Sequence, residues 1–220
     1  MAALSARGAL GGASWMPSGS SSRRPERRSL VICISGRSGT GKSTVGRELA
    51  KCYGLKYVSG GEALRKMARE LGYGAKGDGW WEGAEGQRFL AQRLEDSRFD
   101  KQVDAWLVRL GREGNVVIDS WTIAWLLDKG IGLRVWLYGS PEVRARRVAA
   151  RDGMRPEEAL EAVKAKEERT REIYKRIYGF DLWDLSPYDL VVDTDNLTPE
   201  EVVAAIRAVV ESLRARGEFG

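Results

Sequence analysis

Residues 36–44 of this 220-residue chain read GRSGTGKST, a complete match to the pattern G-x-x-x-x-G-K-S/T. The preceding residues 30–35 form a continuous apolar run, typical of a strand buried on both faces, and residues 42–53 have helical spacing. Glycines let successive backbone N–H groups converge on phosphate oxygens, and the helix that follows adds the positive end of its dipole. The sequence therefore predicts a phosphate-binding loop between a central strand and a helix.

The chemistry of this loop requires particular side chains at its end. We expect Lys42 to reach the β- and γ-phosphates of a nucleoside triphosphate and the Ser43 hydroxyl to ligate Mg²⁺. The predicted cofactors are thus ATP and Mg²⁺. The predicted ATP-binding residues are Gly36, Arg37, Ser38, Gly39, Thr40, Gly41, Lys42, Ser43 and Thr44.

The rest of the chain alternates between apolar runs and helical patterns. Further strands are predicted at 56–59, 115–118, 133–138 and 190–193. Helices are predicted at 61–72, 84–96, 99–113, 121–128, 141–151 and 156–178, and from Thr198 onward. This alternation favours an α/β fold in which helices cover both faces of a parallel five-stranded sheet. The Gly- and Trp-rich stretch 73–83 is predicted as a loop, in which Trp80 or Trp81 either fills the core or stacks on a base.

Composition excludes several classes of protein. The chain has no histidine, which removes Ser-His-Asp and Cys-His nucleophile systems and His-ligated metal sites. Hydrophobic residues make up 43% and charged residues 30%, so a buried core is expected. No apolar run approaches the roughly 18 residues that a membrane span needs, so we expect no membrane partner and a cytoplasmic protein.

The net charge of +5 is unevenly distributed. Residues 1–29 hold five arginines and one glutamate, which leaves 31 basic and 30 acidic residues in the remainder. We interpret residues 1–29 as a disordered basic tail or a mis-assigned start, with an organelle transit peptide as the alternative. Because the body is nearly neutral, nucleic acid is not expected as a partner. We expect small-molecule substrates and a monomer.

Phosphate loops occur in several classes of nucleotide-binding protein, and the remaining sequence narrows the choice. An Asn-Lys-x-Asp segment, which reads guanine in GTPases, is missing. The chain is too short for a two-lobed helicase and lacks the signature sequence of transporter ATPases. A small kinase remains.

Several segments resemble the archaeal type of cytidylate kinase, in the nucleoside monophosphate kinase family. They are the phosphate loop, residues 59–68 (SGGEALRKMA), residues 142–147 (EVRARR) and residues 178–182 (YGFDL) followed by YDL at 188–190. The resemblance runs over about 30–210. It implies a three-layer P-loop kinase fold in one domain, 30–216, with an acceptor-binding insert at about 60–113 and a mobile lid at about 144–172.

The resemblance also implies where the acceptor binds. We expect Ser59, Glu62 and Arg65 to contact it, with the Arg65 guanidinium holding its α-phosphate. The alternative is that Glu62 and Arg65, three residues apart, form an ordinary surface pair on a helix. Asp100 and Asp104 are expected to read the base or the sugar, since a carboxylate suits the exocyclic amine of cytosine, and a solvated helix face is their alternative.

Catalytic roles are expected for Lys42, Asp119, Arg147 and Arg151. Asp119 ends a predicted strand, where it would help to orient Mg²⁺ or, as the alternative, would cap the next helix. Arg147 and Arg151 share a helix face with Arg144, and arginines on a closing lid would stabilise the charge on the transferring group. Their alternative is pairing with glutamates on solvated faces.

The chain departs from the family after its third apolar strand. The family commonly has Glu-Gly-Arg there, or Glu-Ser followed by another residue, whereas this chain has Asp119, Ser120 and Trp121. Either another arginine, such as Arg88 or Arg93, replaces the expected one, or the acceptor differs. The function expected is transfer of the γ-phosphoryl group of ATP to CMP or dCMP. The alternatives are a small-molecule kinase of the shikimate type and an adenylate-kinase-like ATPase of RNA or ribosome maturation.

Overall fold

A computed structural model describes residues 29–219, and the expected tail at 1–29 therefore lies outside the described residues except for Ser29. Within that range the chain forms one parallel sheet in the order β2-β3-β1-β4-β5. The strands are β1 (Val31–Gly36), β2 (Lys56–Ser59), β3 (Val116–Asp119), β4 (Leu133–Tyr138) and β5 (Leu190–Asp193). The predicted α/β fold with five parallel strands is thereby confirmed.

The order of the strands places β1 at the centre. Its residue Ile32 lies beside Val117 of β3 on one side and Leu133 of β4 on the other. The chain crosses from β1 to β2 and back to β3 on one side, and then to β4 and β5 on the other. The strand order thus reverses at β1, and in open α/β sheets ligands bind outside the carboxyl ends of the strands at such a point.

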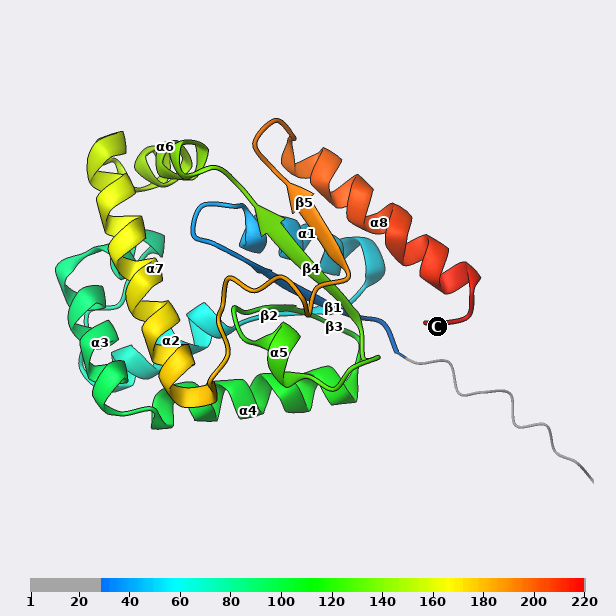
Figure 1. Ribbon diagram of the computed structural model, residues 1–220, viewed down its shortest axis with the longest axis horizontal. Coiled ribbons are helices and arrows are strands. Elements are labelled where there is room, and N and C mark those ends of the chain that lie inside the picture. The colour runs from blue at the N-terminus through cyan, green and yellow to red at the C-terminus, as the bar shows by residue number, and fades with distance from the viewer. Residues whose placement is uncertain (1–28, 220) are drawn as a thin grey trace, which may run out of the picture.

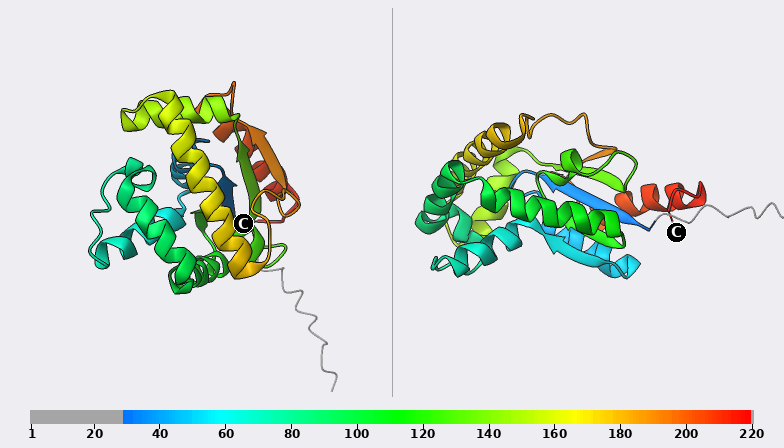
Figure 2. Two further views of the ribbon diagram at one scale, coloured as in Figure 1. Left: turned by 60° about the vertical axis from the view of Figure 1, so that its left-hand side comes forward. Right: turned by 90° about the horizontal axis from the view of Figure 1, so that it is seen from below.

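Helices surround the sheet and gather at one end of it. Those that follow the first two strands are α1 (Lys42–Tyr53), α2 (Gly60–Glu70), the 3₁₀ helix η1 (Asp78–Glu82), α3 (Ala84–Glu95) and α4 (Arg98–Glu113). The later helices are α5 (Ile123–Leu126), α6 (Pro141–Asp152), α7 (Pro156–Tyr178) and α8 (Pro199–Ala215). In Figure 1, α2, α3, α6 and α7 lie at the end toward which the strands run, and α8 lies on the opposite side. Figure 2 shows the same grouping from two further directions.

Alternating side chains of the sheet divide the core into two layers. Val31 and Cys33 belong to a cluster with residues of α2, α3, α4, α5 and α7. Ile32 and Ile34 point the other way, into a cluster formed with α1 and α8. Both faces of β1 are covered, which explains why its sequence is apolar without interruption.

Capping residues in the sequence fix where several helices begin and end. Thr198 caps α8 by accepting a hydrogen bond from the Glu201 backbone N–H, and the Glu201 side chain accepts from Thr198 in return. Gly54 ends α1 in the left-handed conformation, at φ 63°, which a glycine adopts without strain. The predicted bounds of this helix are those observed.

The segments around the Trp residues differ from the prediction. The Gly- and Trp-rich stretch includes η1, and Trp80 and Trp81 are buried with Phe89 in the first core cluster. The aromatic rings pack on one another, with 4.9 Å between the ring centroids of the two tryptophans. The helix predicted at 121–128 is reduced to α5, four residues long. Both tryptophans therefore take part in core packing, and stacking on a base stays a prediction.

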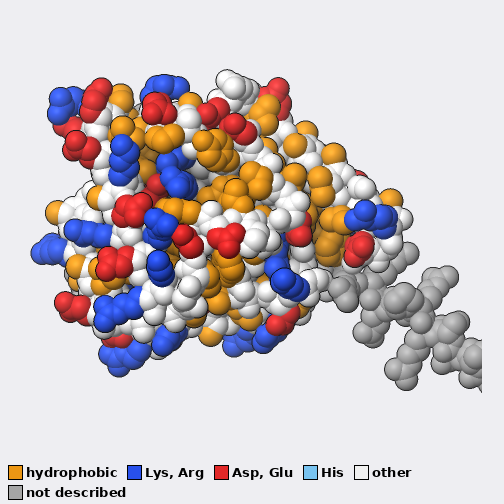
Figure 3. All heavy atoms as spheres, viewed as in Figure 1, with side chains coloured by type: hydrophobic (Ala, Val, Ile, Leu, Met, Phe, Trp, Pro, Cys, Tyr) orange, Lys and Arg blue, Asp and Glu red, His pale blue; other side chains and the backbone are white. Residues whose placement is uncertain are grey.

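In the part of the chain that the structure describes, no helix combines the length and the apolar character needed to cross a membrane. Basic and acidic side chains are intermingled over the face drawn in Figure 3, in keeping with the near-balance of charges outside residues 1–29.

Candidate active site

A cavity of about 470 Å³ opens at the carboxyl ends of β1, β2 and β3, a size suited to a small ligand. One side is the loop between β1 and α1, where Lys42 and Ser43 line the cavity. Residues of α2, α3 and α4 form another part of the lining, and α6 and α7 contribute further residues. The cavity therefore spans the phosphate loop and the predicted acceptor insert without interruption.

The loop has the backbone geometry that its glycines allow. Gly39 and Gly41 have φ values of 80° and 87°, in the left-handed region. A Cβ on Gly39 would lie 2.7 Å from the Arg144 carbonyl oxygen, so a larger residue would displace the loop or α6. The first residues of α1 follow at once, and their backbone N–H groups have no partner within the helix. The arrangement is suited to an anion at the helix N-terminus.

Lys42 lies across this loop. Its Nζ donates a hydrogen bond to the Arg37 carbonyl oxygen at 2.8 Å. Burial lowers the pKa of Lys42 to about 8, since the surroundings solvate an ammonium poorly, while the nearby carboxylate of Asp119 acts in the opposite direction. An ammonium held in poorly solvating surroundings gains the most when a phosphate replaces the missing water.

Ser43 and Asp119 meet beside the loop. The Ser43 hydroxyl donates to Asp119 Oδ2 at 2.8 Å, and the Tyr57 hydroxyl donates to the same oxygen at 2.9 Å. Asp119 is 5% exposed and does not cap α5. Among the described residues there is no group of three or more acidic or cysteine side chains that could hold a metal ion by themselves. One carboxylate and one hydroxyl fit Mg²⁺, which binds few protein ligands and takes the others from phosphates and water.

Two predicted ATP-binding residues do not line the cavity. Gly36 lies against β4, where a Cβ would be 2.4 Å from the Leu137 carbonyl oxygen. The Arg37 side chain turns away from the cavity and covers the ring of Trp183 at 4.1 Å. The prediction that Arg37 binds ATP is therefore corrected for its side chain. The cation–π contact with Trp183 holds the guanidinium away from the cavity. The Arg37 carbonyl, which accepts from Lys42 and Thr40, still shapes the loop.

A buried ion pair holds the loop from behind. Glu167 of α7 accepts a hydrogen bond from the Ser38 backbone N–H at 3.0 Å and pairs with Arg144 of α6. Arg144 donates in turn to the carbonyl oxygens of Ser38 and Gly139, each at 3.0 Å. Both side chains are almost completely buried. Arg144 therefore stabilises the conformation of the phosphate loop, and its side chain does not line the cavity.

The predicted acceptor residues of α2 line the cavity. Ser59 caps the helix, because its hydroxyl accepts from the Glu62 backbone N–H at 3.3 Å. Arg65 donates to the Gly77 carbonyl oxygen at 2.6 Å, and only 14% of its side chain is exposed. Glu62 pairs with Arg47 at 2.6 Å and lies 4.0 Å from Arg65. The Glu62–Arg65 pair considered as the alternative is therefore present at this longer distance, with Arg47 as the closer partner of Glu62.

Asp100 and Asp104 are both buried, which excludes a solvated helix face. Asp100 pairs with Arg93, whose Nε donates to Asp100 Oδ2 at 3.1 Å, and it does not line the cavity. The prediction that Asp100 contacts an acceptor is therefore corrected, because Arg93 holds this carboxylate outside the cavity lining.

Asp104 lines the cavity and accepts hydrogen bonds from the hydroxyls of Thr122 and Tyr178, at 2.6 and 2.8 Å. Burial raises the pKa of Asp104 to about 6, and these two hydrogen bonds only partly offset that effect. Asp104 is therefore a carboxylate that titrates close to neutral pH.

The lid residues divide into two groups. Arg147 and Arg151 line the cavity, with Arg147 donating to the Thr194 carbonyl and hydroxyl oxygens and Arg151 pairing with Asp152. Two other arginines within the predicted lid, Arg169 and Arg171, bind elsewhere. Arg169 donates to the Gln87 carbonyl at 3.3 Å, and Arg171 pairs with Asp181.

Sequence reasoning missed several cavity residues. Lys166 of α7 lines the cavity and pairs with Glu82 of η1 at 2.8 Å, an ion pair between lid and insert. Trp81 and Tyr174 contribute aromatic walls. Trp121, in the place of the expected arginine, also lines the cavity, with its ring 5.8 Å from Lys42 Nζ. Helical spacing alone gave no signal for Lys166 and Tyr174, because several faces of α7 carry charge. Trp81 and Trp121 were singled out in the sequence, and stacking on a base was one of the two interpretations of Trp81.

A phosphate loop after the central strand of a parallel sheet, opening into a cavity with a second set of polar residues, defines a small P-loop kinase. The sequence matches the cytidylate kinase-like family over residues 31–196. The chain is 36% identical to the cytidylate kinase of Pyrococcus horikoshii over 191 residues, which cover 87% of this chain and 93% of that protein. It is 38% identical to the cytidylate kinase of Pyrococcus abyssi over 184 residues, 84% of this chain and 95% of the relative. The chain belongs to the cytidylate kinase-like family and is a nucleoside monophosphate kinase that uses ATP.

Solved structures with similar folds agree on the architecture. An uncharacterized protein from Eubacterium ventriosum superposes with a TM-score of 0.55 at 18% identity, over 83% of this chain and 99% of that chain. Shikimate kinase from Acinetobacter baumannii superposes with a TM-score of 0.52 at 19% identity, over 84% of this chain and 95% of that chain. At this identity the likeness concerns the fold alone.

Proposed function

We propose that the protein transfers the γ-phosphoryl group of ATP to CMP or dCMP, yielding ADP and CDP or dCDP. The observation that carries this proposal is that the phosphate loop, Arg65 and Asp104 line the same cavity. The family supports the reaction type, and the names of the relatives support cytidylate as the acceptor.

ATP would be held through the backbone N–H groups of the loop, from Gly39 to Thr44, and through Lys42. Lys42 would exchange its hydrogen bond to the Arg37 carbonyl for one to the β- and γ-phosphates. Ser43 and Asp119 would hold Mg²⁺, the serine directly and the aspartate directly or through water. When bound, Mg²⁺ would neutralise charge on the phosphates.

The acceptor would lie on the α2 side of the cavity. Arg65 offers a planar guanidinium for its phosphate, and Ser59 and Glu62 are near the same end of α2. Asp104 offers carboxylate oxygens that suit the exocyclic amine of cytosine, since each oxygen keeps a lone pair beyond its one hydrogen bond.

Charge stabilisation would do the catalytic work, because phosphoryl transfer needs little covalent chemistry from the protein. Lys42 belongs to the loop, and Arg147, Arg151 and Lys166 extend from the lid helices into the cavity. We propose that the lid, about 144–172, closes toward the insert, about 60–113, and excludes water. The Lys166–Glu82 ion pair, which already joins these two segments, supports this direction of closure.

An acceptor screen tests the proposal. Purified full-length protein with ATP and Mg²⁺ is assayed for ADP formation with CMP, dCMP, UMP, dUMP, AMP, GMP and shikimate. We expect CMP and dCMP to have the highest kcat/KM, and the K42M variant to be inactive with all of them. Turnover of shikimate alone, or ATP hydrolysis that no nucleotide accelerates, would contradict the proposal and support one of the two alternatives. The monomeric state and the cytoplasmic location stay predictions.

A further inference from the structure

We propose that Arg93 reads the acceptor base, with Asp100 as the residue that positions its guanidinium. This inference rests on the proposed function and adds a specificity residue to it. In the sequence Arg93 was a candidate to replace the phosphate-binding arginine missing at position 121, and the structure favours a different role.

The guanidinium of Arg93 is fixed on one side and open on the other. Its Nε and Nη2 donate to Asp100, and Nη2 also donates to the Tyr174 hydroxyl at 3.3 Å. Among residues 29–219, Nη1 has no hydrogen-bond partner, and it is not among the side-chain atoms that are both buried and unpartnered, namely Trp125 Nε1, Tyr188 Oη and Arg214 Nε. Since Arg93 lines the cavity, Nη1 offers its two N–H groups to a ligand there.

The charges at this end of the cavity disfavour a phosphate. Arg93 is one cation beside two buried carboxylates, Asp100 and Asp104, with exposures of 3%, 0% and 3%. The group as a whole is not positive, so a phosphate would meet Asp104 without a compensating charge. A neutral base whose ring has an acceptor atom next to an amino group fits Arg93 and Asp104 better than a phosphate does. Arg93 would donate to a ring acceptor such as N3 or O2 of cytosine, and Asp104 would accept from its amino group.

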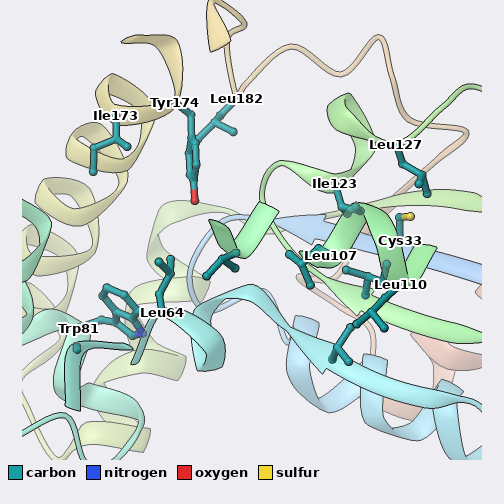
Figure 4. Close-up of a cluster of buried hydrophobic side chains, with 14 of the residues drawn as sticks. Cys33, Leu64, Trp81, Leu107, Leu110, Ile123, Leu127, Ile173, Tyr174 and Leu182 are labelled. Atoms are coloured by element: carbon teal, nitrogen blue, oxygen red, sulfur yellow. The ribbon is translucent and has the colours of Figure 1, made fainter. Parts of the chain in front are cut away.

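Aromatic side chains shape this end for a planar ligand. The centroids of the Trp81 and Tyr174 rings lie 5.7 and 5.9 Å from Arg93 Cζ, and both residues line the cavity. In Figure 4 the Tyr174 side chain projects from α7 toward the side of the cluster that holds Trp81 and Leu64. A flat base next to these rings would keep its edge toward Arg93 and Asp104.

The other candidate, Arg88, lies five residues earlier on the same helix, α3, and has a different environment. Its side chain is 70% exposed and lies 3.7 Å from Glu85. It does not line the cavity. Arg88 is therefore a matched control for charge on α3.

The test compares CMP with ribose 5-phosphate, which has the phosphate and lacks the base. Binding to the full chain is measured by calorimetry for wild type, R93K, R88M and the double variant R93M/D100N, which removes both partners of the buried ion pair. We expect R93M/D100N to weaken CMP binding about 10- to 100-fold, the loss for hydrogen bonds from a charged donor. R93K, which retains the charge needed for folding, should lose part of the same affinity because it lacks the planar fork. Ribose 5-phosphate binding and the KM for ATP should stay at wild-type values, as should every measurement on R88M.

Each outcome decides between the roles. Equal weakening of CMP and ribose 5-phosphate would assign Arg93 to the phosphate and overturn the inference. Unchanged CMP affinity in both R93K and R93M/D100N would also overturn it, while leaving the proposed function in place. A wild-type protein that binds neither CMP nor any other nucleoside monophosphate would overturn the proposed function, and the inference with it.

Discussion

The Ser43 hydroxyl donates a hydrogen bond of 2.8 Å to Asp119 Oδ2, across 76 residues of sequence. The contact joins the first turn of α1 to the carboxyl end of β3, and Tyr57 of β2 donates to the same oxygen. One helix, α1, and two neighbouring strands, β2 and β3, therefore meet at the Asp119 carboxylate beside the phosphate loop.

Replacing Asp119 by Asn should lower kcat about 10²-fold, the scale for removing one electrostatic group from a preorganised site. The reason is loss of the negative charge that would help to hold Mg²⁺. Binding of Mn²⁺, measured by its paramagnetic signal in the presence of a non-hydrolysable ATP analogue, should weaken in parallel. D128N, which removes an exposed acid paired with Arg112, serves as the control and should bind Mn²⁺ as the wild type does. Normal metal affinity in D119N would contradict the role.

Lys42 predicts an alkaline limit to ATP use. Burial lowers the pKa of Lys42 to about 8, so in the free protein its charge is present below that pH and is lost above it. We expect kcat/KM for ATP, measured with saturating acceptor, to fall as the pH rises above about 8, because this ratio reports groups of the free enzyme. The K42R variant keeps its charge at every accessible pH. Its kcat/KM for ATP should therefore not decrease above about pH 8, even though its rate is low. If the kcat/KM of the wild type for ATP stays constant up to pH 9.5, the ionisation of Lys42 does not control the pH dependence of ATP use.

Arg65 should matter for the acceptor and not for ATP. The R65A variant should raise the KM for the acceptor about 10- to 100-fold, the range for hydrogen bonds to a charged group. The KM for ATP should change little, and K66A, at the exposed neighbouring position, should match the wild type. Arg65 also bonds to the Gly77 carbonyl, so the melting temperature of R65A is measured alongside. An unchanged acceptor KM in a folded R65A protein would remove this residue from the site.

Asp104 predicts that base discrimination depends on pH. Burial raises its pKa to about 6, so the carboxylate is ionised above that pH and accepts from an amino group. Below it the protonated form can donate instead, and it then tolerates the carbonyl of uracil. The ratio of kcat/KM for CMP to that for UMP should therefore decrease from pH 8 to pH 5. In D104N, which does not titrate, the ratio should be low and constant; a ratio in wild type that does not vary with pH would count against this carboxylate.

The Arg144–Glu167 pair should contribute strongly to stability. In the E167Q variant Arg144 would stay buried without a countercharge, which costs about 3 to 5 kcal/mol of unfolding free energy in buried pairs. Urea denaturation measures the loss, and R144M/E167Q should recover part of it because neither charge is left unpaired. R155M, which breaks the exposed Arg155–Glu158 pair of α7, should leave the midpoint nearly unchanged. If E167Q and R155M lower the unfolding free energy by the same amount, burial does not explain the stabilising effect of the Arg144–Glu167 pair.

The sequence by itself determined the strands, most helices and the phosphate loop. The match to G-x-x-x-x-G-K-S/T between a buried run and a helical pattern required the loop to follow a central strand, and the observed β1 and α1 have that arrangement. Apolar periodicity located β2, β4 and β5 at their observed residues, because the period of side-chain burial is a local property of the chain.

Only the tertiary structure decided which polar groups meet. The backbone N–H of Ser38 and the carboxylate of Glu167 are 129 residues apart, and no local pattern indicates that they pair. Asp100 and Asp104 lie one helical turn apart and were treated alike in the sequence, yet one holds Arg93 and the other faces the cavity. The physical reason is that a residue's spacing fixes its face on an element, whereas its partner depends on how that element packs against others. The hydrogen-bond partners of Arg93 and Arg144 were set by this packing.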